Sequence, residues 1–249
     1  MPGRQPTRDD FPTSVTLSIT PPPSNYAPTN VLILLHGLGD THASFETLGK
    51  QLALPETTCI SIRAPKPLPF DLGGFHWGDD IMFDQASGEM EFDTGFKEAS
   101  HVIAEEVIQK TLVEKCGYKL RDIVFFGFGQ GGMAAFAAAA DRQISTGTAP
   151  IDFGGLISIG GVMPDDGRLT PSQKNKTPVL ICGGTAKSAV TASAVDKIKT
   201  SFEYVEVKKW KKAGDGMPAN REEMLPIMQF FSRRLRSTRG IPAGSVEMT

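Results

Sequence analysis

Short apolar runs alternate along the chain with longer stretches in which apolar positions recur every three or four residues. The short runs are typical of strands, and the longer stretches of helices that bury one face. Predicted strands lie at residues 31–35, 59–62, 123–126, 156–159, 179–182 and 204–207, and predicted helices at about 44–52, 96–115, 131–140, 192–201 and 221–236. This alternation predicts βαβ units around a mainly parallel sheet.

Three details of the pattern concern how that sheet is covered. The run 31–35 is apolar throughout, which is expected when both faces of a parallel sheet are covered. Apolar residues at positions 96, 99, 103 and 107 have the spacing of a helix face packed on a sheet. Residues 14–20 alternate between polar and apolar and suit an antiparallel edge strand. We therefore predict an α/β fold with helices on both faces of the sheet.

The two ends of the chain differ in composition from the middle. Residues 1–13 are polar and rich in proline, which predicts a loose leader. Residues 14–236 are predicted to form a single domain, followed by a frayed tail at 237–249. Arg233, Arg234 and Arg236 fall at the predicted end of the last helix, where positive charge is favourable. The alternative for these arginines is a patch that binds phosphate or a membrane.

Composition limits the possible partners and location. A formal net charge of −2 predicts no nucleic-acid partner, and no run approaches the roughly 18 apolar residues of a membrane span, which predicts no integral membrane association. The first residues lack the apolar segment of a secretory signal. The 3 cysteines are widely spaced and suit a reducing compartment better than a disulfide framework or a zinc site. We expect a cytoplasmic location, with the nucleus as an alternative, and no cofactor or metal ion.

A glycine-rich loop directly follows the first predicted parallel strand. It reads His36-Gly37-Leu38-Gly39-Asp40, at the sheet edge where open α/β sheets bind ligands. In α/β-hydrolases a loop of this kind offers a backbone N–H to the oxyanion hole. We predict the Leu38 amide as that donor and His36 as part of a pocket. The alternative is a turn that glycine merely makes easier.

A second motif, Gly127-Phe128-Gly129-Gln130-Gly131-Gly132, joins the strand 123–126 to the helix 131–140. In this context a G-x-S-x-G sequence forms the nucleophile elbow of α/β-hydrolases. Here Gly129 stands at the central position, where it can keep a left-handed turn but provides no hydroxyl. The Gln130 amide is predicted to be the second oxyanion donor, and Phe128 a pocket residue.

With these two motifs in place, the chain from about residue 14 to 236 resembles the acyl-protein thioesterase/phospholipase–carboxylesterase family. The run His36-Gly37-Leu38-Gly39-Asp40-Thr41 and the run 127–132 carry the resemblance. The family's own elbow reads Gly-Phe-Ser-Gln-Gly-Gly, so this chain departs at the catalytic serine. The resemblance implies hydrolysis of thioesters of S-acylated proteins, of lysophospholipids and of small carboxylic esters, by acyl transfer to that serine. An acyl or ester small molecule, or an S-acylated protein, is the implied partner.

The other two catalytic positions of the family are also substituted. Its Gly-Asp-x-Asp-Pro segment, after the strand 179–182, aligns with residues 184–190 and puts Lys187 at the catalytic acid. Its Gly-Met-x-His-Ser segment aligns with the run from Gly214 and puts Met217 at the catalytic histidine. The histidines of the chain are His36, His42, His76 and His101, so none follows the elbow.

Several other groups of the sequence are possible replacements for the missing triad. Cys182 ends a predicted strand but is expected to be a buried, inert thiol. His76 and Trp77 are expected to be a pocket wall or a hydrogen-bonding pair. The acids Asp79, Asp80 and Asp84 read as solvated charges without metal-ligand spacing, and the run 183–188 lacks the glycine that a phosphate loop needs before its lysine. We therefore predict a pseudoenzyme that keeps an acyl or ester pocket. The alternatives are a working ester or thioester hydrolase with non-standard residues, or a purely structural or interaction role.

Overall fold

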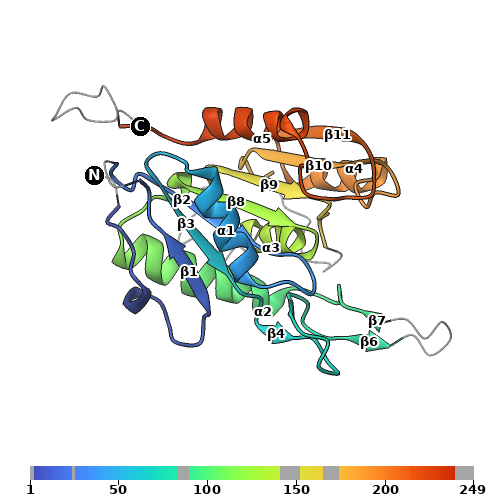
Figure 1. Cartoon of the computed structure of the whole chain (residues 1–249), viewed down its shortest axis with the longest axis horizontal. Helices are drawn as coiled ribbons and strands as arrows, with labels where there is room; N and C mark the ends of the chain where they lie inside the picture. Colours follow the sequence, from blue (N-terminus) through green and yellow to red (C-terminus); the bar gives the residue numbers. More distant parts are fainter. Residues whose placement is uncertain (1–2, 24–25, 84–89, 141–151, 165–173, 239–249) are drawn as a thin grey trace.

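One seven-stranded sheet forms the centre of the molecule, with the strand order β1-β3-β2-β8-β9-β10-β11 (Figure 1). The computed structural model describes residues 3–23, 26–83, 90–140, 152–164 and 174–238. The strands of this sheet are β1 Leu17–Thr20, β2 Asn30–Leu35, β3 Thr57–Ile62, β8 Ile123–Phe128, β9 Gly155–Ile159, β10 Val179–Ala186 and β11 Val205–Ala213. All neighbours pair in parallel except β1, which is antiparallel to β3 at the edge. The predicted sheet and its antiparallel edge strand are confirmed.

The predicted helices are present within a few residues of their expected bounds. They are α1 His42–Leu52, α2 Lys97–Ser100, the π-helix η2 His101–Lys115, α3 Gln130–Ala139, α4 Ala192–Ser201 and α5 Arg221–Arg234, with short 3₁₀ turns η1 Arg8–Asp10 and η3 Leu120–Asp122. Two small hairpins were not predicted: β4 Lys66–Pro67 with β5 Phe75–His76, and β6 Met82–Phe83 with β7 Met90–Glu91. Within the described ranges no helix is both long and apolar enough to cross a membrane.

The predicted helix at 96–115 is divided. After the short α2, the chain continues as a π-helix, whose last turn is closed by a bond from the Cys116 N–H to the Thr111 carbonyl. The predicted apolar face is nevertheless buried, including Ile103 and Val107 at 0% exposure. The wider helical turn therefore leaves this face on the sheet.

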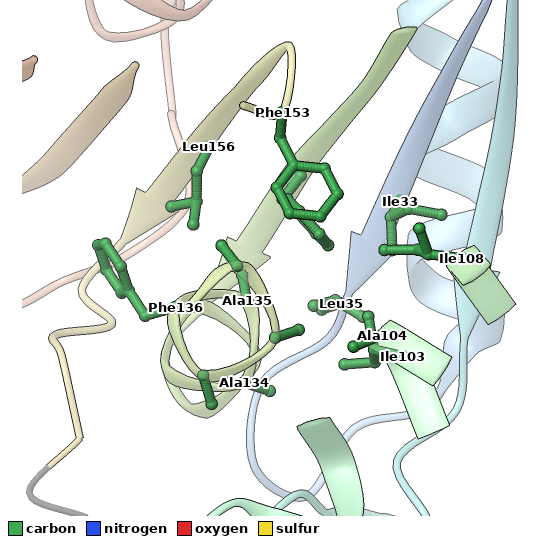
Figure 2. Packing of buried hydrophobic residues seen from close by; sticks show 14 of the residues in the cluster. Ile33, Leu35, Ile103, Ala104, Ile108, Ala134, Ala135, Phe136, Phe153 and Leu156 are labelled. Carbon is green, nitrogen blue, oxygen red and sulfur yellow. The ribbon is translucent and has the colours of Figure 1, made fainter. Parts of the chain in front are cut away.

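Helices cover both faces of the sheet. Successive side chains of a strand point to opposite faces, and along β2 Ile33 joins one apolar cluster while Leu34 joins the other. Residues of η2, α3 and α4 complete the first cluster, part of which is drawn in Figure 2. Residues of α1 and α5 complete the second. The sheet is therefore covered on both sides, and its carboxyl edge is left to the loops.

The segment before β1 differs from the loose leader that its composition suggested. The Arg4 N–H donates to the Cys116 carbonyl at 2.9 Å, and the Arg4 guanidinium pairs with Asp10 at 2.5 Å. Gly3 lies against the ring of Tyr118, and Phe11 is 5% exposed within the core. The contacts of Arg4 with Cys116 and of Gly3 with Tyr118 join residues more than a hundred positions apart, which a local pattern does not reveal. Most of the expected tail, residues 239–249, lies outside the described residues.

Candidate functional site

The turn between β8 and α3 consists of one residue. Gly129 has φ 51° and ψ −121°, so the strand reverses directly into the helix. Its N–H donates to the Ile159 carbonyl of the neighbouring strand at 2.8 Å, and its own carbonyl accepts from the Gly132 N–H at 2.9 Å. Glycine adopts this left-handed conformation without the steric penalty that other residues meet. The predicted elbow geometry is present.

The steric requirement for glycine differs among the positions of this turn. A Cβ at Gly127 would lie 2.5 Å from the Gly131 carbonyl oxygen, and one at Gly131 would lie 2.3 Å from the Leu35 carbonyl oxygen. Both positions therefore need glycine because backbone approaches backbone. A Cβ at Gly129 would meet no atom within 4 Å. A side chain at this position would thus begin in open space. The positive φ angle of residue 129 is the remaining obstacle to a residue other than glycine.

The loop after β2 lies directly beside the elbow. A Cβ at Gly37 would be 2.8 Å from a ring carbon of Phe128, so this ring covers the loop. Leu38 is 46% exposed at its tip. Among the described residues, neither the Leu38 amide nor the Gln130 amide has a hydrogen-bond acceptor. Two neighbouring turns therefore each carry a backbone N–H without an acceptor among the described residues, and their role as oxyanion donors stays a prediction.

His36 is buried beneath this loop and is not on a pocket wall. Its ring is 0% exposed. The Nε2 atom accepts from the Ala64 N–H at 3.0 Å, so the proton resides on Nδ1, which donates to the Gly37 carbonyl at 2.8 Å. Burial lowers the pKa of His36, and it also lowers the pKa of His42 and of His76. The ring is therefore a neutral structural group that joins the loop to the segment after β3.

A stability change at mildly acidic pH follows from these buried rings. The unfolded chain binds protons below about pH 6.5 while the folded chain resists them, so the free energy of unfolding should fall as pH drops below 6.5. Each ring contributes at most about 1.4 kcal/mol per pH unit. Urea unfolding followed across this window should show a smaller pH dependence for His36→Gln than for the unchanged chain. The matched control is His101→Gln, at an exposed ring. An undiminished dependence in His36→Gln would contradict the assignment.

The side chain of Gln130 has a role that the sequence did not indicate. Its Oε1 accepts from the Trp77 N–H at 2.7 Å, and its Nε2 donates to the Phe92 carbonyl and to Asp93, each at 2.9 Å. The Trp77 indole in turn donates to the His36 carbonyl at 2.8 Å. Gln130 thus holds the segments 75–78 and 90–94 against the elbow. Only its backbone amide had been predicted to matter.

Trp77 and His76 are interior residues, and this corrects the predicted pocket wall. Trp77 is 0% exposed and its ring centroid lies 5.3 Å from that of His36. His76 is 2% exposed and meets the edge of Phe92, with no described partner for its Nδ1. The two rings are therefore not paired with each other. Both rings lie behind the loops, and burial of the large Trp77 ring removes apolar surface from water.

The two remaining predicted positions lie on the loops after β10 and β11. Lys187 is exposed and has φ 50° in the turn after β10. Met217 is partly buried and packs against the apolar cluster of α1 and α5, and its carbonyl accepts from the Lys212 ammonium at 2.8 Å. Both are thus at the expected carboxyl edge of the sheet. Their side chains are an exposed cation and an apolar packing group.

Asp215 joins these two loops, which the sequence did not predict. Its carboxylate accepts from the Gly184 N–H at 2.9 Å and from the Ala189 N–H at 2.7 Å. A Cβ at Gly160 would lie 2.5 Å from the Cβ of Asp215, so the residue also abuts the end of β9. Gly160 immediately follows Ile159, which accepts from the elbow. Asp215 is therefore close to the turn but committed to backbone amides.

Comparison with known proteins identifies the family of this chain. A model of the phospholipase/carboxylesterase family matches residues 21–234. The chain belongs to this family.

Relatives of this phospholipase/carboxylesterase-family chain include uncharacterized hydrolases and acyl-protein thioesterases. An uncharacterized hydrolase of Schizosaccharomyces pombe is 32% identical over 211 residues, which is 83% of each chain. Acyl-protein thioesterase 1 of Kluyveromyces lactis is 27% identical over 222 residues, covering 83% of this chain and 92% of that one. The crystal structure of Zea mays acyl-protein thioesterase 2 superposes with a TM-score of 0.64 at 22% identity, over 89% of this chain and 99% of that one. This structural likeness shows the shared α/β-hydrolase fold.

The other groups that the sequence offers in this family member are buried, hydrogen-bonded to the backbone or outside the described residues. Cys182 is 0% exposed, and burial raises the pKa of its thiol to about 12, so it is protonated at neutral pH. Asp79 accepts from the Lys97 and Glu98 N–H groups, each at 2.9 Å, and thereby caps α2. It is not the solvated charge that we expected. Asp84 lies outside the described residues, and within the described ranges no three potential metal ligands cluster.

Proposed function

We propose that this chain is a catalytically impaired member of the phospholipase/carboxylesterase family that binds an acyl or ester group without efficient hydrolysis. The turn at Gly129 carries this proposal, because it has the left-handed backbone of an elbow and no side chain to attack a carbonyl. The sequence contains no histidine after residue 101. Acyl transfer needs both a nucleophile and a base that accepts its proton.

The positions on the neighbouring loops also lack the required chemistry. Lys187 is a cation where an acid would orient an imidazole, and Met217 cannot accept a proton. In a reference serine hydrolase, removal of the triad lowers turnover about 10⁶-fold, while oxyanion donors and binding leave about 10³–10⁴ over water. The free amides of Leu38 and Gln130 therefore account for trace hydrolysis at most.

Apolar side chains beside the elbow support binding of an acyl group. Leu38 is 46% exposed, Phe70 81% and Leu72 61%. The segment that carries the last two is close to the loop after β2, because a Cβ at Gly74 would fall 2.1 Å from the Gly39 carbonyl oxygen. Exposed apolar groups gathered at one edge are typical of surfaces that bind a ligand or a partner. The implied partner is an acyl or ester small molecule or an S-acylated protein, and the proposed location is the cytoplasm.

Two measurements test the loss of catalysis. A fluorophosphonate probe, which reacts with activated serines, should leave the purified chain unlabelled. Turnover of a p-nitrophenyl ester or a thioester should not exceed that of a buffer-plus-albumin control. Stoichiometric labelling, or turnover clearly above that control, would refute the pseudoenzyme proposal.

Binding is tested separately by native mass spectrometry with an added medium-chain acyl ester. We expect the unchanged chain to retain the ester, and Leu38→Ser to retain at least about threefold less because an apolar contact is lost. Leu225→Ser, at a residue 50% exposed on α5, is the matched control and should retain as much as the unchanged chain. Equal retention by all three proteins would show that the loop does not bind the acyl group.

A further inference from the structure

A hollow lies at the edge of the sheet opposite the elbow, where β9, β10 and β11 begin. It has a volume of about 390 Å³ and is bounded by the residues before these strands and by the end of α5. Gly154 precedes β9, Pro178 precedes β10 and Tyr204 precedes β11. The elbow lies at the other end of these strands. Since a five-residue strand is roughly 16 Å long, about one strand length separates the hollow from the elbow. Its volume is in the range of small-ligand sites.

The lining carries more positive than negative groups. Arg121, Lys176, Arg233 and Arg234 contribute four cations, and Asp152 and Glu206 two carboxylates. Both oxygens of Glu206 accept from Arg233, at 2.7 and 2.9 Å, so this pair neutralises itself. Three cations then face one remaining carboxylate. Such an excess favours an anionic ligand.

The side chain of Arg234 is held in place by its neighbours. Its side-chain stem lies over Gly155, where a Cβ would be 3.4 Å from its Cγ and 2.7 Å from the Phe230 ring. Its Nε donates to the Arg233 carbonyl at 3.0 Å, which leaves the two terminal nitrogens without an acceptor among the described residues. Burial first, and then the neighbouring cations Arg121 and Arg233, lower the pKa of Arg234. Its charge is therefore held in place but not neutralised.

We propose that this hollow binds a small soluble phosphate monoester, with the phosphate on Arg121, Lys176 and Arg234. A guanidinium fork binds two phosphate oxygens at once, and a dianion matches the three unpaired cations better than a single carboxylate does. Among the described residues, the side chains of Arg121 and Lys176 donate no hydrogen bond. Phe230, Pro178 and Tyr204 provide apolar surface for the organic part of the ester. This site is independent of the acyl-binding site proposed above.

Calorimetric titration of the full chain with phenyl phosphate tests the site. We expect phenyl phosphate to bind more tightly than inorganic phosphate, and benzoate to bind weakly. Arg234→Gln should lower the affinity for phenyl phosphate at least about tenfold, since charge-assisted bonds are lost. Arg221→Gln makes the same change at the other end of α5, roughly 20 Å away, and should alter it less than about twofold. Asp152→Asn should raise it roughly two- to fivefold by removing a like charge.

A different set of results would overturn the site. No detectable binding of phenyl phosphate, or equal weakening by Arg234→Gln and Arg221→Gln, would each do so. Binding to vesicles that contain phosphatidic acid, without binding of the soluble ester, would indicate a membrane surface instead. If Arg234→Gln does not give a folded protein, Arg121→Gln and Lys176→Gln take its place, and full affinity in both would be equally decisive against the proposal.

Discussion

The triple variant Gly129→Ser, Lys187→Asp and Met217→His should hydrolyse p-nitrophenyl esters at least about 100-fold faster than the unchanged chain, whereas Gly129→Ser alone should remain near background. A serine without a base is a weak nucleophile at neutral pH, because its hydroxyl keeps its proton. An imidazole supplies that base, and an acid holds the imidazole in its productive tautomer. The gain should therefore appear only when all three groups are present.

The structure favours the first of these changes and is less favourable to the others. A Cβ at position 129 would meet no atom within 4 Å, so there is open space where a serine side chain begins. Met217, in contrast, packs against an apolar cluster, and a histidine there must turn toward the elbow. Asp215 already joins the two loops through the Gly184 and Ala189 amides. We leave it unchanged so that the loops keep their positions.

Initial rates with a p-nitrophenyl ester and labelling by a fluorophosphonate provide two separate readouts. The variant with Lys187→Asp and Met217→His but with Gly129 retained is the matched control, and it should neither hydrolyse the ester nor react with the probe. Hydrolysis by Gly129→Ser alone at the rate of the triple variant would contradict the placement of the acid and the base at 187 and 217. Labelling of the control would indicate a nucleophile elsewhere in the chain.

The parts of this molecule that the sequence predicts are those set by local pattern. Strand β2 is apolar at five consecutive positions because each of its faces is covered, and that is visible without any partner. The elbow is visible because Gly127 and Gly131 are needed where backbone meets backbone. These requirements act over a few residues. Such short-range requirements therefore produce short sequence motifs that can be recognised without the structure.

What the sequence does not predict depends on residues that meet only after folding. The Gln130 side chain binds the Trp77 amide 53 positions away, and Asp215 binds the Gly184 amide 31 positions away. Neither bond leaves a periodic pattern. The packing of Arg4 on the Cys116 carbonyl has the same origin, and it explains why a polar, proline-rich segment was wrongly expected to be loose. The sequence indicates the loop in which a side chain lies, but not the backbone groups with which it forms hydrogen bonds.

Alanine at two glycines of the elbow should have very different effects on stability. Gly131→Ala should lower the free energy of unfolding by more than about 3 kcal/mol, because the new Cβ would lie 2.3 Å from the Leu35 carbonyl and 2.4 Å from that of His36. Gly131 is the second residue of α3, where alanine would otherwise be preferred to glycine by roughly 0.5–1 kcal/mol. A loss at this position would therefore result from the close backbone contact and not from helix propensity.

Gly129→Ala should cost only about 1–3 kcal/mol, the penalty for an L-residue in a left-handed turn, since the added Cβ meets no atom within 4 Å. Urea unfolding of both variants, with equal slopes, gives the comparison directly. A loss at 129 as large as that at 131 would mean that packing requires glycine at the centre of the elbow, so the missing hydroxyl would follow from structure alone. A clearly smaller loss at 129 has the opposite meaning. The turn would then still tolerate the side chain that an esterase needs, and the absence of that side chain would be a change in chemistry on an unchanged fold.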